Sequence, residues 1–162
     1  MDPAEYRRVL GHFPTGVTIV TAMSGLTPQG FTVGSFFSVS LEPALVGFCA
    51  GKASSSWPAI RDAGAFCVNV LSEAQASLCQ DFSKVGDRFG AVPWERVDGG
   101  APRLLGAAAW IDCALTEVVE AGDHEICIGE VRDLGARDTA SPLLFHRGRL
   151  GGFKPHEVVG AG

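Results

Sequence analysis

Residues 51–60 read GKASSSWPAI and place Lys52, Ser54, Ser55 and Ser56 just before a predicted helix. Free N–H groups at a helix N-terminus, serine hydroxyls and a compact cation together suit a phosphate group. The alternative is that one serine caps the helix while the others face water, and the segment by itself favours this alternative. Lys52 shifts the balance toward a phosphate site.

A second segment, residues 30–41, reads GFTVGSFFSVSL and distributes Thr32, Ser35, Ser38 and Ser40 among apolar and aromatic side chains. An ordinary barrel strand has the same pattern, and periodicity alone favours that interpretation. A flavin ring, however, needs flat apolar walls and hydrogen-bond donors near its pyrimidine end, where negative charge develops when the ring is reduced. A hydroxyl-rich edge that contains glycine could supply both.

A third segment, residues 121–131, reads AGDHEICIGEV and places His124 directly after a turn, at the start of a strand. No serine or cysteine lies at a spacing typical of a catalytic triad, so nucleophilic catalysis is not indicated. The other histidines are dispersed, and the five cysteines form no CxxC pair. We therefore predict no metal site, no disulfide framework, and buried thiols.

The composition is that of a folded chain of one domain, with 162 residues of which 46% are hydrophobic and 19% charged. A formal net charge of -5 argues against nucleic-acid binding, which needs concentrated Lys and Arg. The first residues are charged and no long apolar run follows, so we expect no membrane segment and a cytoplasmic location. The chain contains neither GxGxxG nor GxxxxGK[ST], so any nucleotide must bind without a Rossmann turn or a Walker loop.

The elements that must position these residues are mainly strands. A leading helix is expected from the Asp2 cap and ends near Gly11, a second helix ends near Gly64, and a third begins with a Ser72–Gln75 capping box and runs toward Phe82. Residues 83–102 are expected to be loop-rich, and a turn is expected through Gly25, Pro28 and Gln29. Strands are predicted at residues 16–23, 31–41, 44–50, 65–71, 107–119, 124–134 and 143–150. This order favours a closed antiparallel barrel, mainly β with inserted helices.

Several motifs occur in a fixed order along nearly the whole chain, roughly residues 6–153: FPTGVTIVTA, GFTVGSFFSVSLEPALVGFC, KASSSW, FCVNVLSEAQ, DRFGAVPW, GDHEICIGEV and PLLFHRGRLGGF. This series resembles the flavin reductase-like family. The resemblance implies a single FMN-binding split β-barrel domain over residues 1–162 and a homodimer. It also implies a reaction in which NADH or NADPH reduces FMN or FAD, after which the reduced flavin leaves for a partner monooxygenase.

The same resemblance implies roles for individual residues. His124, in its GDH motif, would lie against the nicotinamide. The isoalloxazine and ribityl chain would contact residues 32–40, which include Thr32, Val33, Gly34, Ser35, Ser38, Val39 and Ser40. The ribityl phosphate would be held by Ala50, Gly51, Lys52, Ser54, Ser55 and Ser56. Additional flavin contacts would come from Phe82 and Arg88.

Two other functions are compatible with the same residues. A flavin oxidase of the pyridoxamine phosphate type would keep its FMN and oxidise a bound amine, but it would need more anchoring cations than this sequence contains. A flavin carrier or sensor without enzymatic activity would use the same binding residues as a reductase. The sequence leaves open the partner oxygenase, the choice between NADH and NADPH, and the choice between FMN and FAD.

Overall fold

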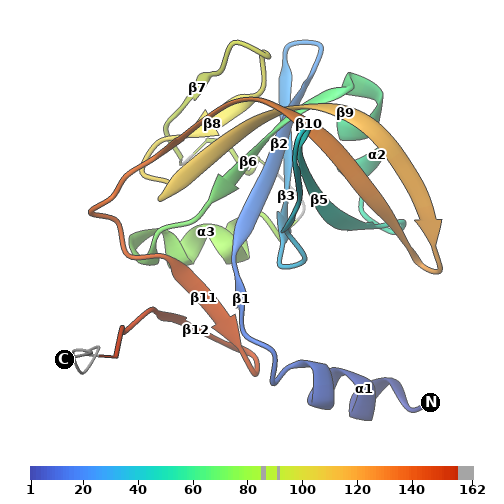
Figure 1. The fold of residues 1–162 in the computed structure, drawn as a ribbon, viewed down its shortest axis with the longest axis vertical. Helices are drawn as coiled ribbons and strands as arrows, with labels where there is room; N and C mark the ends of the chain where they lie inside the picture. The colour runs from blue at the N-terminus through green and yellow to red at the C-terminus, as the bar shows by residue number, and fades with distance from the viewer. Residues whose placement is uncertain (85–86, 91, 157–162) are drawn as a thin grey trace.

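The computed structural model describes residues 1–84, 87–90 and 92–156. Figure 1 shows a curled sheet with short helices at its margins and an extension formed by the N-terminal helix and a C-terminal hairpin. Ala91 of the DRFGAVPW motif and most of the C-terminal tail lie outside the described residues. No helix in the described ranges is long and apolar enough to cross a membrane.

Seven antiparallel strands form the main sheet in the order β3-β2-β6-β9-β10-β5-β4. Their bounds are β2 (Thr18–Ser24), β3 (Thr27–Val33), β4 (Phe37–Leu41), β5 (Ala44–Gly51), β6 (Ala65–Val70), β9 (Ala109–Ala121) and β10 (His124–Ala136). The sheet curls until Phe31 of β3 packs edge-on against Phe48 of β5, with 6.2 Å between ring centroids. Within the described residues the edge strands β3 and β4 do not pair with each other. The antiparallel β class is confirmed, and the barrel is split at this seam.

The prediction of one strand over residues 31–41 was wrong. The segment contributes to β3 at one edge of the sheet and to β4 at the other, and residues 34–36 cross the seam between them. The alternation of apolar and polar side chains breaks at Ser35 and Phe36, but strand-forming residues continue on both sides of the crossing, and such a pattern does not specify which strand is the partner. Pro28 and Gln29, expected in a turn, lie within β3, because the hairpin turns earlier, at Gly25 with φ +60°.

Two further predictions, the strand at residues 143–150 and the loop at residues 83–102, differ from the structure, which has short hairpins there. Residues 143–150 form two strands, β11 (Leu143–His146) and β12 (Arg149–Gly152), because Arg147 and Gly148 turn the chain with φ of +50° and +78°. β1 (Thr15–Gly16) pairs with β11. The expected loop at residues 83–102 contains β7 (Trp94–Arg96), which pairs with β8 (Pro102–Leu104).

The three expected helices are confirmed. α1 (Pro3–Leu10) begins at Asp2, whose carboxylate accepts a hydrogen bond from the Ala4 amide at 3.1 Å. α2 (Trp57–Ala63) ends at Gly64, which has the left-handed φ of +67° that favours glycine. The Ser72–Gln75 capping box opens a 3₁₀ turn, η1 (Glu73–Gln75), that continues as α3 (Ala76–Asp81).

Two apolar clusters form the core on opposite sides of β2. Trp57 and Ile60 of α2 close one cluster inside the curled sheet, and Leu78 of α3 packs into the other. Cys67, Cys113 and Cys127 are buried, and burial raises the pKa of each of these thiols to about 12. The prediction of buried thiols was wrong for Cys49 and Cys79, which are only partly buried.

Candidate functional site

The C-terminal end of β5 is where the predicted site segments meet. On one side, β4 pairs with β5 so that Ser38 lies opposite Val46. Just before β4, the Ser35 hydroxyl accepts a hydrogen bond from the Cys49 amide at 2.9 Å and donates one to the Cys49 carbonyl at 3.2 Å. On the other side, His124 of β10 lies opposite Gly51. β5 therefore lies beside all three candidate regions. These are the segment at and before β4 that would face the flavin ring, the loop after β5 that would bind the phosphate, and His124, which would face the nicotinamide.

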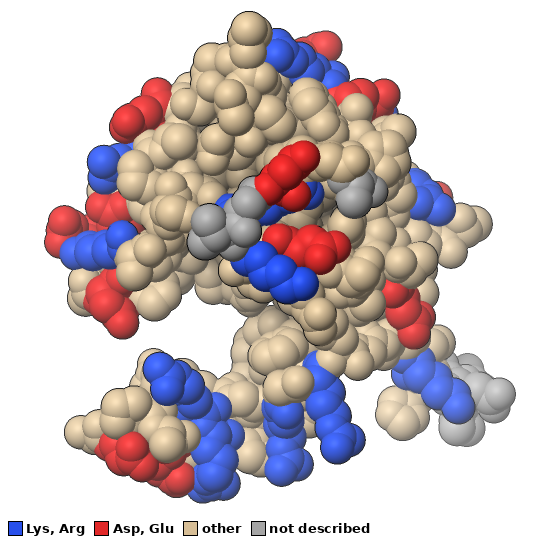
Figure 2. Space-filling view, turned by 180° about the vertical axis from the view of Figure 1, so that it is seen from behind, with Lys and Arg blue, Asp and Glu red and all other residues tan. Residues whose placement is uncertain are grey.

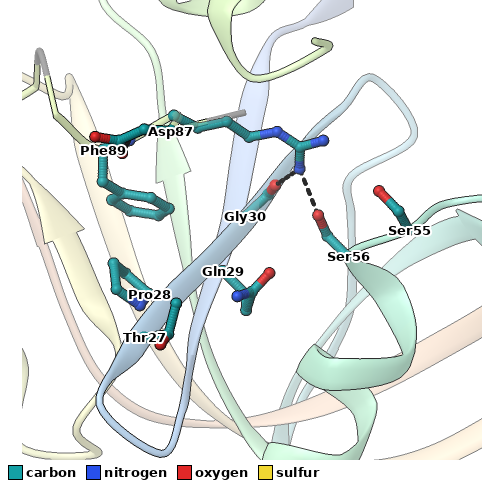
Figure 3. A pocket seen from close by; sticks show the side chains of 9 residues that line it. Thr27, Pro28, Gln29, Gly30, Ser55, Ser56, Asp87 and Phe89 are labelled. Carbon is teal, nitrogen blue, oxygen red and sulfur yellow. Dashed lines mark hydrogen bonds between the residues drawn. The ribbon is translucent and has the colours of Figure 1, made fainter. Parts of the chain in front are cut away.

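A pocket of about 450 Å³ opens beside the start of α2 (Figure 3), within the size range of small-ligand sites. Arg88 is one of its lining residues, and the dashed lines that end at Gly30 and Ser56 in Figure 3 mark hydrogen bonds from its guanidinium group. The residues that line the pocket are Thr27, Pro28, Gln29, Gly30, Ser55, Ser56, Asp87, Arg88 and Phe89.

Arg88 links three segments of the chain. Its Nη1 donates to the Gly30 carbonyl at 2.6 Å and to the Ser56 hydroxyl, and its Nε donates to the Lys84 carbonyl at 2.6 Å. Nη2 makes no hydrogen bond to a residue that the structure describes. The guanidinium is thus fixed by three acceptors and keeps N–H donors for an anion.

Ser56 departs from the simple capping role considered above. It occupies the N-cap position of α2 and is 3% exposed, yet its side chain makes no capping hydrogen bond. Its hydroxyl instead accepts from Arg88. The interpretation that one serine caps this helix is therefore wrong for Ser56, and the hydroxyl belongs to the wall of the pocket.

Phe82 lies behind the pocket wall. It is 1% exposed, and its ring packs against Phe89 with 5.0 Å between centroids. A Cβ atom at Gly30 would lie 2.9 Å from the Phe82 ring, so glycine is needed for this close approach. The packing makes Phe82 a support for Gly30, and its proposed direct contact with flavin stays a prediction.

Lys52 is held at the turn between β9 and β10. Its Nζ lies 2.7 Å from Glu120 Oε2, and its amide donates to the Asp123 carbonyl at 3.0 Å. This ion pair lowers the pKa of the exposed Glu120 carboxyl. The amide of Ser54 donates to the Gly51 carbonyl at 3.0 Å, which turns the chain toward Ser55 at the pocket. Lys52 and the pocket serines therefore lie on one short loop, but the ammonium group is paired with Glu120.

His124 lies on the other side of the same turn. Gly122, with φ +67°, and Asp123 connect β9 to β10 and place His124 at the first position of β10, as predicted. The His124 Nδ1–H donates to Asp123 Oδ1 at 2.7 Å, and this interaction lowers the pKa of the Asp123 carboxyl. A Cβ atom at Gly51 would lie 3.5 Å from His124 Nε2. Asp123 therefore orients a half-exposed imidazole across the end of β5.

The remaining predicted residues range from fully buried through partly buried to exposed. Val33 and Ala50 are buried in the core, so their side chains do not face solvent at the site. The Thr32 hydroxyl donates to the Cys79 carbonyl at 3.3 Å, and the Ser40 hydroxyl accepts from the Glu42 amide at 3.2 Å. The exposed members are Gly34, Ser35, Ser38 and Val39. These exposed residues come in adjacent pairs and do not alternate with buried ones, and together they form the candidate flavin edge.

Sequence reasoning missed Asp87 and Glu120. Asp87 Oδ1 accepts from the amides of Phe89 and Gly90 at 3.0 and 2.9 Å, and an Asp followed closely by Gly could have predicted this turn. Glu120 had no local signal, because it meets Lys52 across 68 positions of sequence.

The arrangement is suited to binding and positioning. Hydroxyl and guanidinium donors converge at the pocket, and the carboxylate there, Asp87, is used by backbone amides. Such donors fit the phosphate of a flavin or nucleotide. The exposed edge before β4 is joined to β5 through the hydrogen bonds between Ser35 and Cys49.

Comparison with known proteins identifies relatives over nearly the full chain. Residues 10–154 match the family described as Flavin reductase like domain. A flavin reductase of Pseudomonas putida is 51% identical over 94% of this chain and 91% of its own length. The reductase subunit HsaB of a flavin-dependent monooxygenase from Rhodococcus jostii is 46% identical over 99% of this chain and 83% of its own. The structure of the NADH:FAD oxidoreductase SgcE6 of Streptomyces globisporus, in complex with NAD and FAD fragments, superposes with a TM-score of 0.91 at 39% identity over 96% of this chain and 95% of that chain.

Proposed function

The chain belongs to the flavin reductase-like family, and from this we propose that it is an NAD(P)H:flavin oxidoreductase. It reduces FMN or FAD with NADH or NADPH and releases the reduced flavin to a partner monooxygenase. The observation that carries the proposal is the 51% identity to a flavin reductase over 94% of the chain. The donor set around Arg88 and Ser56 supports it, because a flavin phosphate needs such donors.

The proposed hydride transfer requires little acid–base catalysis by protein side chains. A bound flavin supplies the ring that accepts a hydride from the nicotinamide. In our proposal Lys52, Ser55, Ser56 and Arg88 bind the flavin phosphate, and the exposed edge from Gly34 to Val39 faces its ring. His124, oriented by Asp123, positions the nicotinamide. Their contribution is the relative placement of two rings.

A monooxygenase partner is supported by the relative named as a monooxygenase reductase subunit. We further propose a homodimer, because α1 has no buried residue and presents apolar side chains to solvent. A single domain over residues 1–162 and a cytoplasmic location remain part of the proposal.

Steady-state kinetics test the proposal against its alternatives. We expect NADH or NADPH consumption to require added FMN or FAD, and the reduced flavin to pass freely through a membrane that retains the protein. Flavin binding without nucleotide consumption would instead indicate a carrier or sensor. Flavin that survives extended dialysis and does not exchange during turnover would favour an oxidase of the pyridoxamine phosphate type.

A further inference from the structure

Lys52 is surrounded by more negative than positive charge. Glu120 Oε2 lies 2.7 Å from its Nζ, and the Asp123 carboxylate also acts electrostatically on the same group. The Nδ1–H of His124 already donates a hydrogen bond to Asp123. A phosphate that approaches Lys52 therefore meets a cation that a carboxylate already neutralises.

The backbone holds this arrangement in place. Glu120 lies opposite Glu125 in the ladder between β9 and β10, one position before Ala121 pairs with His124. The Lys52 amide is tied to the Asp123 carbonyl on the same turn. The two partners therefore remain neighbours because the strands position their backbones, and the ion pair needs only local side-chain ordering.

We propose that Glu120 is an intramolecular competitor of the flavin phosphate for Lys52, and that it keeps flavin binding weak enough for release. This inference rests on the proposed function and assigns to Glu120 a role in setting affinity. When phosphate contacts Lys52, the Lys52–Glu120 pair must separate or share the ammonium group. When flavin leaves, Glu120 restores the pairing of Lys52. Both effects lower the net gain of FMN binding without altering the ring contacts.

The expected change in FMN affinity is small because both partners of the Lys52–Glu120 ion pair are partly or largely exposed to solvent. The Lys52 and Glu120 side chains are 38% and 79% exposed, so water and salt screen their attraction. Exposed ion pairs of this kind change equilibria by about two- to fivefold. A change of this size alters the affinity of a transient flavin complex but does not make the complex permanent.

The test compares FMN and riboflavin binding by fluorescence titration to wild type, Glu120→Gln, Lys52→Ala and the double variant. Riboflavin lacks the phosphate and reports on the ring contacts alone. We expect Glu120→Gln to tighten FMN binding about two- to fivefold at low salt, with less gain at high salt. Riboflavin binding should stay unchanged, and stopped-flow release of FMN should slow by a similar factor. Lys52→Ala should weaken FMN binding more than riboflavin binding, and adding Glu120→Gln to it should bring no gain.

Glu117→Gln is the matched control, because it removes the same charge from β9 at an exposed position that forms no ion pair with a described residue. If Glu117→Gln tightens FMN binding as much as Glu120→Gln does, the effect comes from net charge and the inference is overturned. The same holds if Glu120→Gln still tightens FMN binding in the Lys52→Ala background. Unchanged FMN affinity in Glu120→Gln, with a loss in Lys52→Ala, would overturn the inference but leave the phosphate role of Lys52 intact. If Lys52→Ala weakens both ligands equally or neither, that phosphate role fails as well. Nucleotide consumption by wild type tests the reductase function independently of all these variants.

Discussion

At the scale of single residues, the turn between β9 and β10 combines a fixed imidazole with space in front of it. Asp123 accepts from His124 Nδ1, which fixes the ring and leaves Nε2 toward Gly51. Gly51 has no side chain to fill the space beside Nε2. The pair resembles other sites in which a carboxylate fixes the tautomer and orientation of a histidine.

His124→Ala should slow flavin reduction or raise the apparent Michaelis constant for the nucleotide, while flavin affinity stays nearly unchanged. The reason is that, in the function proposed above, His124 orients the nicotinamide and transfers no proton. His124→Asn, which keeps a side-chain donor, should lose less. Stopped-flow reduction and flavin titration measure the two quantities separately. Wild-type reduction rates in a His124→Ala protein that melts normally would show that His124 is structural.

At the scale of elements, β9 supports the hairpin of β7 and β8 through one buried carboxyl. Asp112 is 1% exposed, and its Oδ2 accepts from the Gly99 amide at 2.9 Å. Its Oδ1 is buried without a hydrogen-bond partner in the described structure. Burial raises the pKa of Asp112, and the hydrogen bond from Gly99 only partly opposes this effect.

The folded state should therefore bind a proton at Asp112 more tightly than the unfolded chain. The contribution of Asp112 to the free energy of unfolding should fall as pH rises from the ordinary carboxyl pKa of about 3.9 through the raised value. Asp112→Asn removes the charge and can still accept from Gly99. We expect this variant to be more stable than wild type at pH 7, with the difference shrinking toward pH 4.

Urea unfolding of both proteins at several pH values measures this difference. Asp138→Asn is the control, because Asp138 is exposed and its loss of charge should leave stability nearly unchanged. A variant Asp112→Asn that is less stable than wild type at every pH would show that the ionised carboxylate is needed by the hairpin.

At the scale of the whole molecule, the surface is unevenly charged and the fold has an unsupported extension. Figure 2 shows Lys and Arg side chains gathered over the extension that contains α1 and the β11–β12 hairpin, although the chain has a formal net charge of -5. The Arg147 amide donates to the Gly11 carbonyl at 3.0 Å and joins the two parts. The helix has eight residues, none of them buried. Its apolar side chains and those that follow are half or more exposed: Tyr6, Val9, Leu10 and Phe13.

A helix this short gains most of its stability from packing against other surfaces, so we expect a second copy of the chain to cover it. Light scattering should give twice the 17.0 kDa chain mass. Phe13→Asp should shift the protein toward monomer, because Phe13 is 76% exposed beside α1. Leu26→Asp is the matched control, since Leu26 is 89% exposed at the distant turn between β2 and β3. A monomeric wild type, or equal effects of both substitutions, would contradict this assignment.

Local chemistry made much of the fold predictable. Asp2 caps α1, Gly64 ends α2 in a left-handed conformation, and the Ser72–Gln75 box opens η1, each through contacts within a few residues. The turn at Gly122 likewise placed His124 at the start of β10. Signals of this range are encoded by side chains that act on their own backbone, so the sequence by itself determined where these elements begin and end.

Contacts between distant segments were decided only by the tertiary structure. Residues 31–41 divide between β3 and β4 because the curled sheet brings its two edges together, whereas the sequence shows only a local break in alternation at Ser35 and Phe36. Arg88 reaches Ser56 across 32 positions and Lys52 reaches Glu120 across 68. Charge and hydrogen-bonding capacity belong to a residue type, but the partner depends on strand register and sheet curvature, which arise from packing of the whole chain.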